Sequence, residues 1–162
     1  TNIYYELPPR ALSKTVLKDV LDDNVDKKYF LSKDGLNSFL SNIKVNNNIS
    51  KDGINKSFVI PKEIHNDNER QRRVYSLKSK SPTILARADT TKIFVENSVR
   101  KLTPLECERL QCIPDNYTSM ASDTQRYKMI GNAFTVSVIE HFLKGMSKEP
   151  SLKKRIKQET LF

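Results

Sequence analysis

The sequence predicts an α+β fold, in which a small mixed, β-rich part with short helices is followed by helical segments toward the C-terminus. Thr103-Pro-Leu-Glu106 has the form of a capping box with proline at the first helical position, which predicts a helix over 103–112. Apolar residues recur at helical spacing from 134 to 146 and predict another helix. Short β-prone runs separated by turn-rich sequence precede residue 101 and predict the strands.

The composition suits a folded domain, or a part of a larger one. The chain has 162 residues, and the 37% that are hydrophobic are spread throughout. It contains no apolar run long enough for a membrane helix, and its first residues lack the charged and apolar regions of a signal peptide. We therefore expect a cytoplasmic protein with no membrane contact.

Cysteine and histidine are scarce in this chain. Cys107 and Cys112 have no second pair nearby, and His65 and His141 are the only histidines. This pattern favours neither a zinc site nor a disulfide framework, so we expect no metal. Both cysteines are expected to be small, reduced and buried side chains.

The formal net charge of +9 is concentrated in two regions. Residues 60–101 hold ten Lys and Arg against five Asp and Glu, and residues 144–162 hold six against two. A basic middle and a basic tail favour a polyanionic partner. Charge alone leaves open a lysine-rich surface with no nucleic-acid role.

The N-terminal part of the chain is predicted to form structural scaffold and not contact residues. Apolar residues share one face of a predicted helix over 12–21, and a second short helix is predicted over 33–40. Residues 41–57 are turn-rich, with Asp52-Gly53 as a candidate hairpin turn. Phe58-Val-Ile-Pro61 is typical of a strand end closed by proline.

Two polar segments carry the side chains best suited to contact bases. Residues 65–73 are predicted to form a loop that runs into a β-prone stretch, 73–77, and residues 82–92 form a second polar loop. Arginine can bind guanine through two hydrogen bonds, and glutamine can do the same with adenine. The first segment contains four such side chains in a row, Arg70, Gln71, Arg72 and Arg73.

Two blocks in the last third carry a family resemblance. The first contains Arg100-x-Leu-Thr-Pro-x-Glu106, then Arg-Leu-Gln and Pro-Asp-x-Tyr, ending at Tyr117. The second contains Gln125-x-Tyr127 and Gly131-Asn-Ala133. These blocks resemble the ninth and tenth conserved motifs of the DNA (cytosine-5) methyltransferases. The resemblance covers the whole chain but only the C-terminal part of the family pattern.

The resemblance implies a domain layout and a shared cofactor. Residues 1–101 would form the small target-recognition domain, 102–146 would return to the catalytic domain, and 147–162 would be a basic tail. The C-terminal helix would then complete the α/β methyltransferase domain of a partner segment. The turn at Gly131-Asn132 would lie against S-adenosylmethionine, with Asn132 as the polar contact and Ala133 and Phe134 as backbone or packing contacts. Gly131 and Asn132 can equally be a tight turn and a helix cap.

The same resemblance implies that two loops of the small domain face the DNA major groove. Thr83-Ile84 corresponds to a Thr-aliphatic pair that marks the second loop, and Arg73 falls where a base-reading arginine sits. The division of the other side chains between bases and phosphates stays open, as does a role for any of them as a solvated loop residue. These side chains are Arg70, Gln71, Arg72, Arg87 and Lys92.

The chain lacks the family's catalytic blocks, and no catalytic residue is assigned. It has no Pro-Cys-Gln loop, no Phe-x-Gly-x-Gly loop and no Glu-Asn-Val block. Glu96-Asn-Ser-Val99 resembles the last of these, but we interpret it as a strand over 92–96 followed by a turn.

We expect two partners in a bacterial or phage setting: double-stranded DNA, and an N-terminal catalytic half against which the apolar face of 134–146 packs. The target cytosine would be flipped into that half. Alone, the chain would bind DNA weakly and methylate nothing. The alternatives are a non-enzymatic DNA-binding or regulatory module derived from this half, and a protein-interaction domain.

Overall fold

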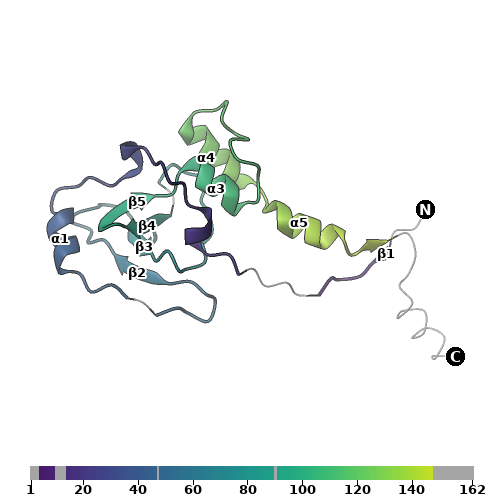
Figure 1. The fold of residues 1–162 in the computed structure, drawn as a ribbon, viewed down its shortest axis with the longest axis horizontal. Helices are drawn as coiled ribbons and strands as arrows, with labels where there is room; N and C mark the ends of the chain where they lie inside the picture. Colours follow the sequence, from purple (N-terminus) through teal and green to yellow (C-terminus); the bar gives the residue numbers. More distant parts are fainter. Residues whose placement is uncertain (1–3, 10–13, 47, 90, 148–162) are drawn as a thin grey trace. The chain divides into compact units, whose positions relative to one another are not determined.

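A four-stranded sheet with the order β2-β3-β4-β5 forms the centre of the larger of two units in this computed structural model (Figure 1). The structure describes residues 4–9, 14–46, 48–89 and 91–147. The larger unit spans Lys14–Ala133. β3 pairs antiparallel with β2 and parallel with β4, and β4 pairs antiparallel with β5. The strands are β2 (Lys56–Val59), β3 (Arg73–Tyr75), β4 (Lys92–Val95) and β5 (Ser98–Lys101).

Apolar residues on the two faces of this sheet form separate clusters. Val74 and Tyr75 are consecutive in β3 and belong to different clusters, because alternate strand residues point to opposite faces. One cluster contains Tyr75, Ile93 and residues of the helices α3 and α4, and the other contains Val74 and Leu36 of α1. The α+β fold class is therefore confirmed. The helices are α1 (Leu36–Asn42), α2 (Glu69–Arg72), α3 (Pro104–Leu110) and α4 (Asp123–Asn132).

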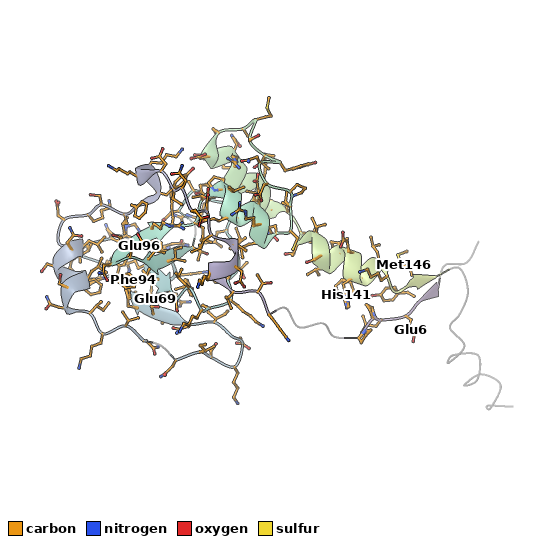
Figure 2. All side chains as sticks on the ribbon, viewed as in Figure 1. Glu6, Glu69, Phe94, Glu96, His141 and Met146 are labelled. Carbon is orange, nitrogen blue, oxygen red and sulfur yellow. The ribbon has the colours of Figure 1, made fainter. Side chains whose placement is uncertain are left out.

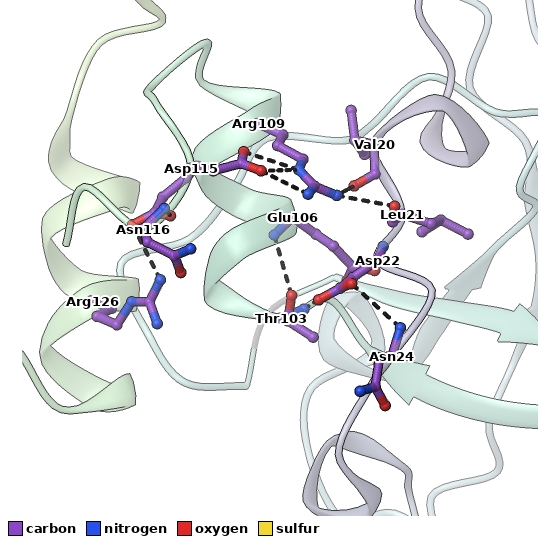
Figure 3. Close-up of polar contacts among 11 residues, drawn as sticks. Val20, Leu21, Asp22, Asn24, Thr103, Glu106, Arg109, Asp115, Asn116 and Arg126 are labelled. Atoms are coloured by element: carbon purple, nitrogen blue, oxygen red, sulfur yellow. Dashed lines mark hydrogen bonds and ion pairs between the residues drawn. The ribbon is translucent and has the colours of Figure 1, made fainter. Parts of the chain in front are cut away.

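The predicted capping box forms at the start of α3. The Thr103 hydroxyl accepts from the Glu106 amide at 3.2 Å, and the Glu106 carboxylate accepts from the Thr103 amide at 2.7 Å. The same carboxylate accepts from the Asp22 amide at 3.0 Å. Figure 3 shows how these bonds join α3 to the segment around residue 22. The Glu106 carboxylate thus satisfies one helix-terminal amide and the Asp22 amide of a distant loop, and the Thr103 hydroxyl satisfies a second helix-terminal amide.

The stretch before Arg100, predicted as a strand followed by a turn, is part of a hairpin formed by β4 and β5. Val95 pairs with Ser98, and the two residues between them, Glu96 and Asn97, have positive φ angles of 48° and 62°. Two positive φ values are typical of the two-residue turn that matches strand twist. The predicted strand therefore forms over Lys92–Val95 and the predicted turn at Glu96 and Asn97, whereas Ser98 and Val99 already belong to β5.

The helix predicted over 12–21 is wrong for most of its described part. Only a 3-10 turn, η1 (Leu17–Val20), forms, and Leu12 lies outside the described residues. The amide of Leu17 donates to the Ser79 carbonyl at 2.8 Å, and that of Lys18 donates to the Leu77 carbonyl at 2.9 Å. Pairing with a distant segment therefore replaces the local helical bonds. A second 3-10 turn, η2, spans Lys27–Tyr29.

Three further predictions were imprecise. The loop predicted over 65–73 contains the short helix α2, and the helix predicted over 33–40 forms two to three residues later as α1. The Asp52-Gly53 turn forms, with Gly53 at a φ of 78°, but no strand precedes it among residues 43–46 and 48–50. Cys107 is buried as expected, whereas Cys112 is exposed because it follows the end of α3 at a positive φ of 55°.

The smaller unit combines the two ends of the chain, residues 1–13 and 134–162. Its described part contains the helix α5 (Val136–Leu143) and an antiparallel pair, β1 (Tyr4–Tyr5) with β6 (Met146–Ser147). The predicted helix over 134–146 is therefore shorter than expected. No helix in the described ranges has the length and apolar character needed to cross a bilayer.

Candidate nucleic-acid interface

The two polar segments come together in a hollow beside β3. Arg70, Gln71 and Arg73 line one side of it, and Thr83 lines the other, together with Tyr75, Pro82, Leu85 and Thr91. The parallel pairing of Val74 with Lys92 places the two segments next to each other. Residues separated by ten or more positions in sequence thus present guanidinium, amide and hydroxyl groups to one concave surface.

Arg70 and Arg73 differ in whether the guanidinium group is already bonded to another side chain. Arg70 is exposed and bonds to no partner within the described ranges, so its guanidinium is available to a ligand. The Arg73 guanidinium donates to the Glu69 carboxylate at 2.7 Å and 2.5 Å. The hydrogen bond from Arg73 holds the pKa of Glu69 below its usual range. This pair is solvent-accessible, and exposed pairs are weak, so a polyanion can compete with Glu69 for Arg73.

Arg72 and Lys92, predicted as DNA contacts, face inward. The Arg72 guanidinium donates to the carbonyls of Ile60 at 2.6 Å and Asp67 at 3.2 Å. The Lys92 side chain is 2% exposed, and its ammonium donates to the Gln71 carbonyl at 2.7 Å and the Asp89 carboxylate at 2.5 Å. Burial lowers the pKa of Lys92 despite these acceptors. This placement removes both residues from the set that faces the hollow.

A polar network holds the two segments together. Arg87, which is exposed, bonds to Asp67 at 3.3 Å, and the His65 ring lies 3.5 Å from the Asp89 carboxylate. A hydrogen bond from the Asn68 amide is the main cause that lowers the pKa of Asp67. Asp67 and Asp89 were not identified as important by sequence analysis. Each is an acidic residue within a basic segment, and such a residue is a candidate partner for a neighbouring Lys or Arg.

The histidine and the two aspartates of this network have the composition of a small metal-ligand group. Their ligand atoms lie within 4.8 Å of one another. Lys92 and Arg87 already place cationic groups against the two carboxylates, at 2.5 Å and 3.3 Å. A cation would have to displace these groups, so we interpret the cluster as a structural network and assign no metal to it.

Thr83 and Ile84 have different surroundings. Thr83 is exposed at the rim of the hollow. Ile84 is half-buried and packs against the cluster that contains Tyr127 and Ile130 of α4. Ile84 therefore anchors the second segment, and Thr83 presents its hydroxyl beside that anchor.

Gly131, Asn132 and Ala133 occupy the end of α4 and do not form the turn predicted at Gly131-Asn132. Gly131 and Asn132 are its last two residues, and Ala133 caps it. The helix continues this far because its C-terminal half is anchored on residues that flank α3: the Tyr127 hydroxyl donates to the Leu102 carbonyl at 2.7 Å, and the Gln111 side chain donates to the Ile130 carbonyl at 3.1 Å. Asn132 and Ala133 are exposed.

Buried polar contacts fix the loop between α3 and α4. Glu108 is fully buried and accepts from the amides of Asn116 at 2.8 Å and Thr118 at 2.9 Å, from the Thr118 hydroxyl, and from Arg126 at 3.2 Å. Burial alone would raise the pKa of Glu108, but these hydrogen bonds outweigh it and lower the pKa. Arg109 holds the same loop from outside, through Asp115 at 2.7 Å (Figure 3).

The apolar face of α5 is exposed, as predicted. The helix has no buried residue, and within its own unit the His141 ring lies 3.0 Å from the Pro9 carbonyl oxygen. Figure 2 shows the side chains of this helix, with His141 labelled, and Met146 of β6 beyond it. Phe134, which precedes the helix, is 78% exposed. The exposed apolar side chains are Phe134, Val136, Val138, Ile139, Phe142, Leu143 and Met146.

Solved structures with the same fold are methyltransferases. The Dnmt2 methyltransferase of S. pombe matches with a TM-score of 0.51 and 13% identity, over 80% of this chain and 41% of that one. The Entamoeba histolytica methyltransferase EhMeth matches with a TM-score of 0.52 and 12% identity, over 89% of this chain and 45% of that one. At these identities the likeness shows the fold alone.

Sequence relatives include Type II methyltransferases. M.SsoII of Shigella sonnei is 32% identical over 141 residues, which is 84% of this chain and 33% of that protein. M1.ScrFI of Lactococcus lactis subsp. cremoris is 28% identical over 145 residues, 88% of this chain and 34% of that protein. The chain thus spans about a third of the length of these curated relatives. The model of C-5 cytosine-specific DNA methylases matches residues 4–148, and the chain therefore belongs to that family.

Proposed function

We propose that this chain is the target-recognition and C-terminal part of a DNA (cytosine-5) methyltransferase. The observation that carries the proposal is the hollow where Arg70, Gln71 and Arg73 meet Thr83 across two segments. In a member of this family, such a convergence of base-reading groups fits the edge of a duplex. We propose three parts: a recognition part (1–101), a segment that returns to the catalytic domain (102–146) and a basic tail (147–162). Ser147 is the one residue of the tail that lies within the described residues.

Arg70 and Arg73 are proposed to bind guanine or phosphate, and Gln71 to bind adenine. Their planar, multiply bonding groups suit base edges in the major groove. Arg87 lies further from the hollow and is paired with Asp67, so we assign it to the phosphate backbone. Arg72 and Lys92 position these groups from inside the fold.

The end of α4 is proposed to border the S-adenosylmethionine site. Gly131, Asn132 and Ala133 would hold the cofactor together with Phe134, and the exposed carboxamide of Asn132 fits a polar contact to it. When bound, the cofactor supplies the methyl group that is transferred to C5 of a flipped cytosine.

The catalytic cysteine and glutamate are proposed to belong to an N-terminal part. The exposed apolar face of α5 fits this proposal, because such a face is stabilised when it packs against another domain. A partner polypeptide and an N-terminal segment of the same chain offer the same packing surface.

Reconstitution tests the proposal. The chain would be mixed with a polypeptide carrying the N-terminal part of a relative such as M.SsoII, with labelled S-adenosylmethionine and duplex DNA of mixed sequence. Methyl transfer by the mixture, and by neither component alone, is the expected result. Salt-sensitive DNA binding that no catalytic part changes would instead support a non-enzymatic DNA-binding or regulatory module.

A further inference from the structure

Gly131 lies where the end of α4 meets the backbone of the segment 82–89. A Cβ atom at this position would lie 2.4 Å from the Ala86 nitrogen and 2.5 Å from both the Ala86 Cα and the Leu85 carbonyl carbon. These distances are far below van der Waals contact, and the atoms belong to the main chain, which cannot rotate out of the way. Gly131 does not have a positive φ, so close approach, and not backbone conformation, is what requires glycine here.

The helix side of this contact is fixed. Tyr127 and Ile130 of α4 are both fully buried. The Tyr127 hydroxyl bonds to the Leu102 carbonyl at 2.7 Å, and the Ile130 carbonyl accepts from Gln111 at 3.1 Å. A side chain at position 131 would therefore displace the segment and not the helix.

The segment side of the contact leads to the hollow. Thr83 and Leu85 line the same hollow as Arg73, and the Arg87 guanidinium lies 3.3 Å from the Asp67 carboxylate. The Lys101 ammonium holds the Ala88 carbonyl at 3.3 Å. A shift at Leu85 and Ala86 would thus change the spacing between the two sets of base-reading groups.

We propose that Gly131 is a positioning residue for the DNA-reading segment 82–89, an inference that rests on the proposed DNA-reading function. The absence of a side chain lets the segment lie directly on the end of α4, and this contact sets the distance from Thr83 to Arg70 and Arg73. The helix end that carries the proposed cofactor contacts therefore also sets the geometry with which DNA is read.

The test uses the 162-residue chain and its Gly131→Ala variant without cofactor. A pool of randomised duplexes is selected on the wild-type chain, and fluorescence anisotropy then compares the enriched duplex with a shuffled one over a range of salt concentrations. We expect Gly131→Ala to reduce the ratio of the two affinities on the order of tenfold, the effect of one misplaced base contact. The salt dependence should stay unchanged, because the phosphate contacts remain.

Met129→Ala is the matched control, because Met129 is 49% exposed on the same helix. It should retain the wild-type affinity ratio. Hydrogen exchange supplies a readout without DNA: amides of residues 82–89 should exchange faster in Gly131→Ala, whereas those of α3 should not. Wild-type discrimination together with wild-type exchange in Gly131→Ala would overturn the positioning role.

Two other outcomes distinguish a failure of the positioning role from a failure of the proposed DNA-reading function. If the wild-type chain enriches no duplex, the DNA-reading function fails, and the positioning role fails with it. If circular dichroism shows that Gly131→Ala does not fold, the Ala88→Gly variant is measured in its place. This substitution removes a methyl group that packs against the cluster containing Tyr127 and Ile130, and it thereby loosens the contact between segment 82–89 and α4. An unchanged affinity ratio in Ala88→Gly would then overturn the inference.

Discussion

Arg100 and Glu106 form a buried ion pair with two hydrogen bonds, at 2.7 Å and 2.8 Å, between the last strand of the sheet and the first turn of α3. Their side chains are 3% and 0% exposed. The Glu106 carboxylate also caps the helix and binds the Asp22 amide, so one pair joins the sheet, the helix and the N-terminal segment.

Arg100→Met should strongly destabilise the larger unit. It leaves Glu106 buried without its countercharge, which costs about 3–5 kcal/mol when one partner of a buried pair is removed. Urea unfolding followed by circular dichroism measures the change in the free energy of unfolding. Arg100→Met combined with Glu106→Gln should be less destabilised than Arg100→Met alone, because the carboxamide carries no unpaired charge and its oxygen can still accept from a cap amide. A double variant that is no more stable than the single one would contradict this account.

Glu108 should make stability depend on acidity. Because the folded state lowers its pKa, the ionised carboxylate stabilises the fold above the ordinary glutamate value, and this contribution is lost as the pH falls through the folded pKa. Glu108→Gln should therefore be destabilised near neutral pH, and its difference from wild type should narrow toward about pH 3. Unfolding free energies across this range measure the effect. Glu63→Gln, at an exposed glutamate, should track wild type throughout.

Arg70→Ala should weaken DNA binding directly. Arg70 lines the hollow and has no competing bond among the described residues, so its loss should reduce affinity for the selected duplex by about tenfold if it reads a base. If Arg70 contacts a phosphate instead, the slope of log affinity against log salt should fall by about one. Lys33→Ala, at an exposed lysine of the larger unit, is the control. Equal effects of the two substitutions would argue against a specific contact.

Lys92→Met should behave differently from Arg70→Ala. The Lys92 ammonium is buried between the Gln71 carbonyl and Asp89, so its loss should cost about 1–3 kcal/mol of stability. DNA affinity should fall because the segments are misplaced, whereas the salt slope should stay at the wild-type value. A reduced slope with unchanged stability would return Lys92 to the set of direct DNA contacts.

The apolar face of α5 should govern association and not the stability of the larger unit. Ile139→Ser with Phe142→Ser changes side chains that are 40% and 45% exposed. The double variant should leave the unfolding free energy of the larger unit within about 0.5 kcal/mol of wild type. It should also lower the binding of an apolar dye and abolish reconstitution with the N-terminal part. Unimpaired reconstitution would show that this face is not the docking surface.

The sequence by itself determined the features that depend on neighbouring residues. The capping box of Thr103 and Glu106 forms because its bonds close within one helical turn, and the Glu96-Asn97 hairpin forms because its two strands are adjacent in sequence. The apolar periodicity after residue 134 likewise predicted a helix with one exposed apolar face, although the helix itself is shorter. The motif spacing also indicated the family, which the match over residues 4–148 shows.

Only the tertiary structure decided which basic residues face outward and which glycine position has no room for a side chain. Lys92 and Arg72 are basic residues of the same two segments as Arg70, but each also donates to a carbonyl more than ten residues away, that of Gln71 or of Ile60, and so faces inward. The carbonyls of Leu77 and Ser79 accept hydrogen bonds from the amides of Lys18 and Leu17, and this pairing replaces the helix predicted over 12–21. Gly131 has the pattern of a turn, yet it ends a helix against Leu85 and Ala86, because long-range contacts set backbone approach and local propensity does not.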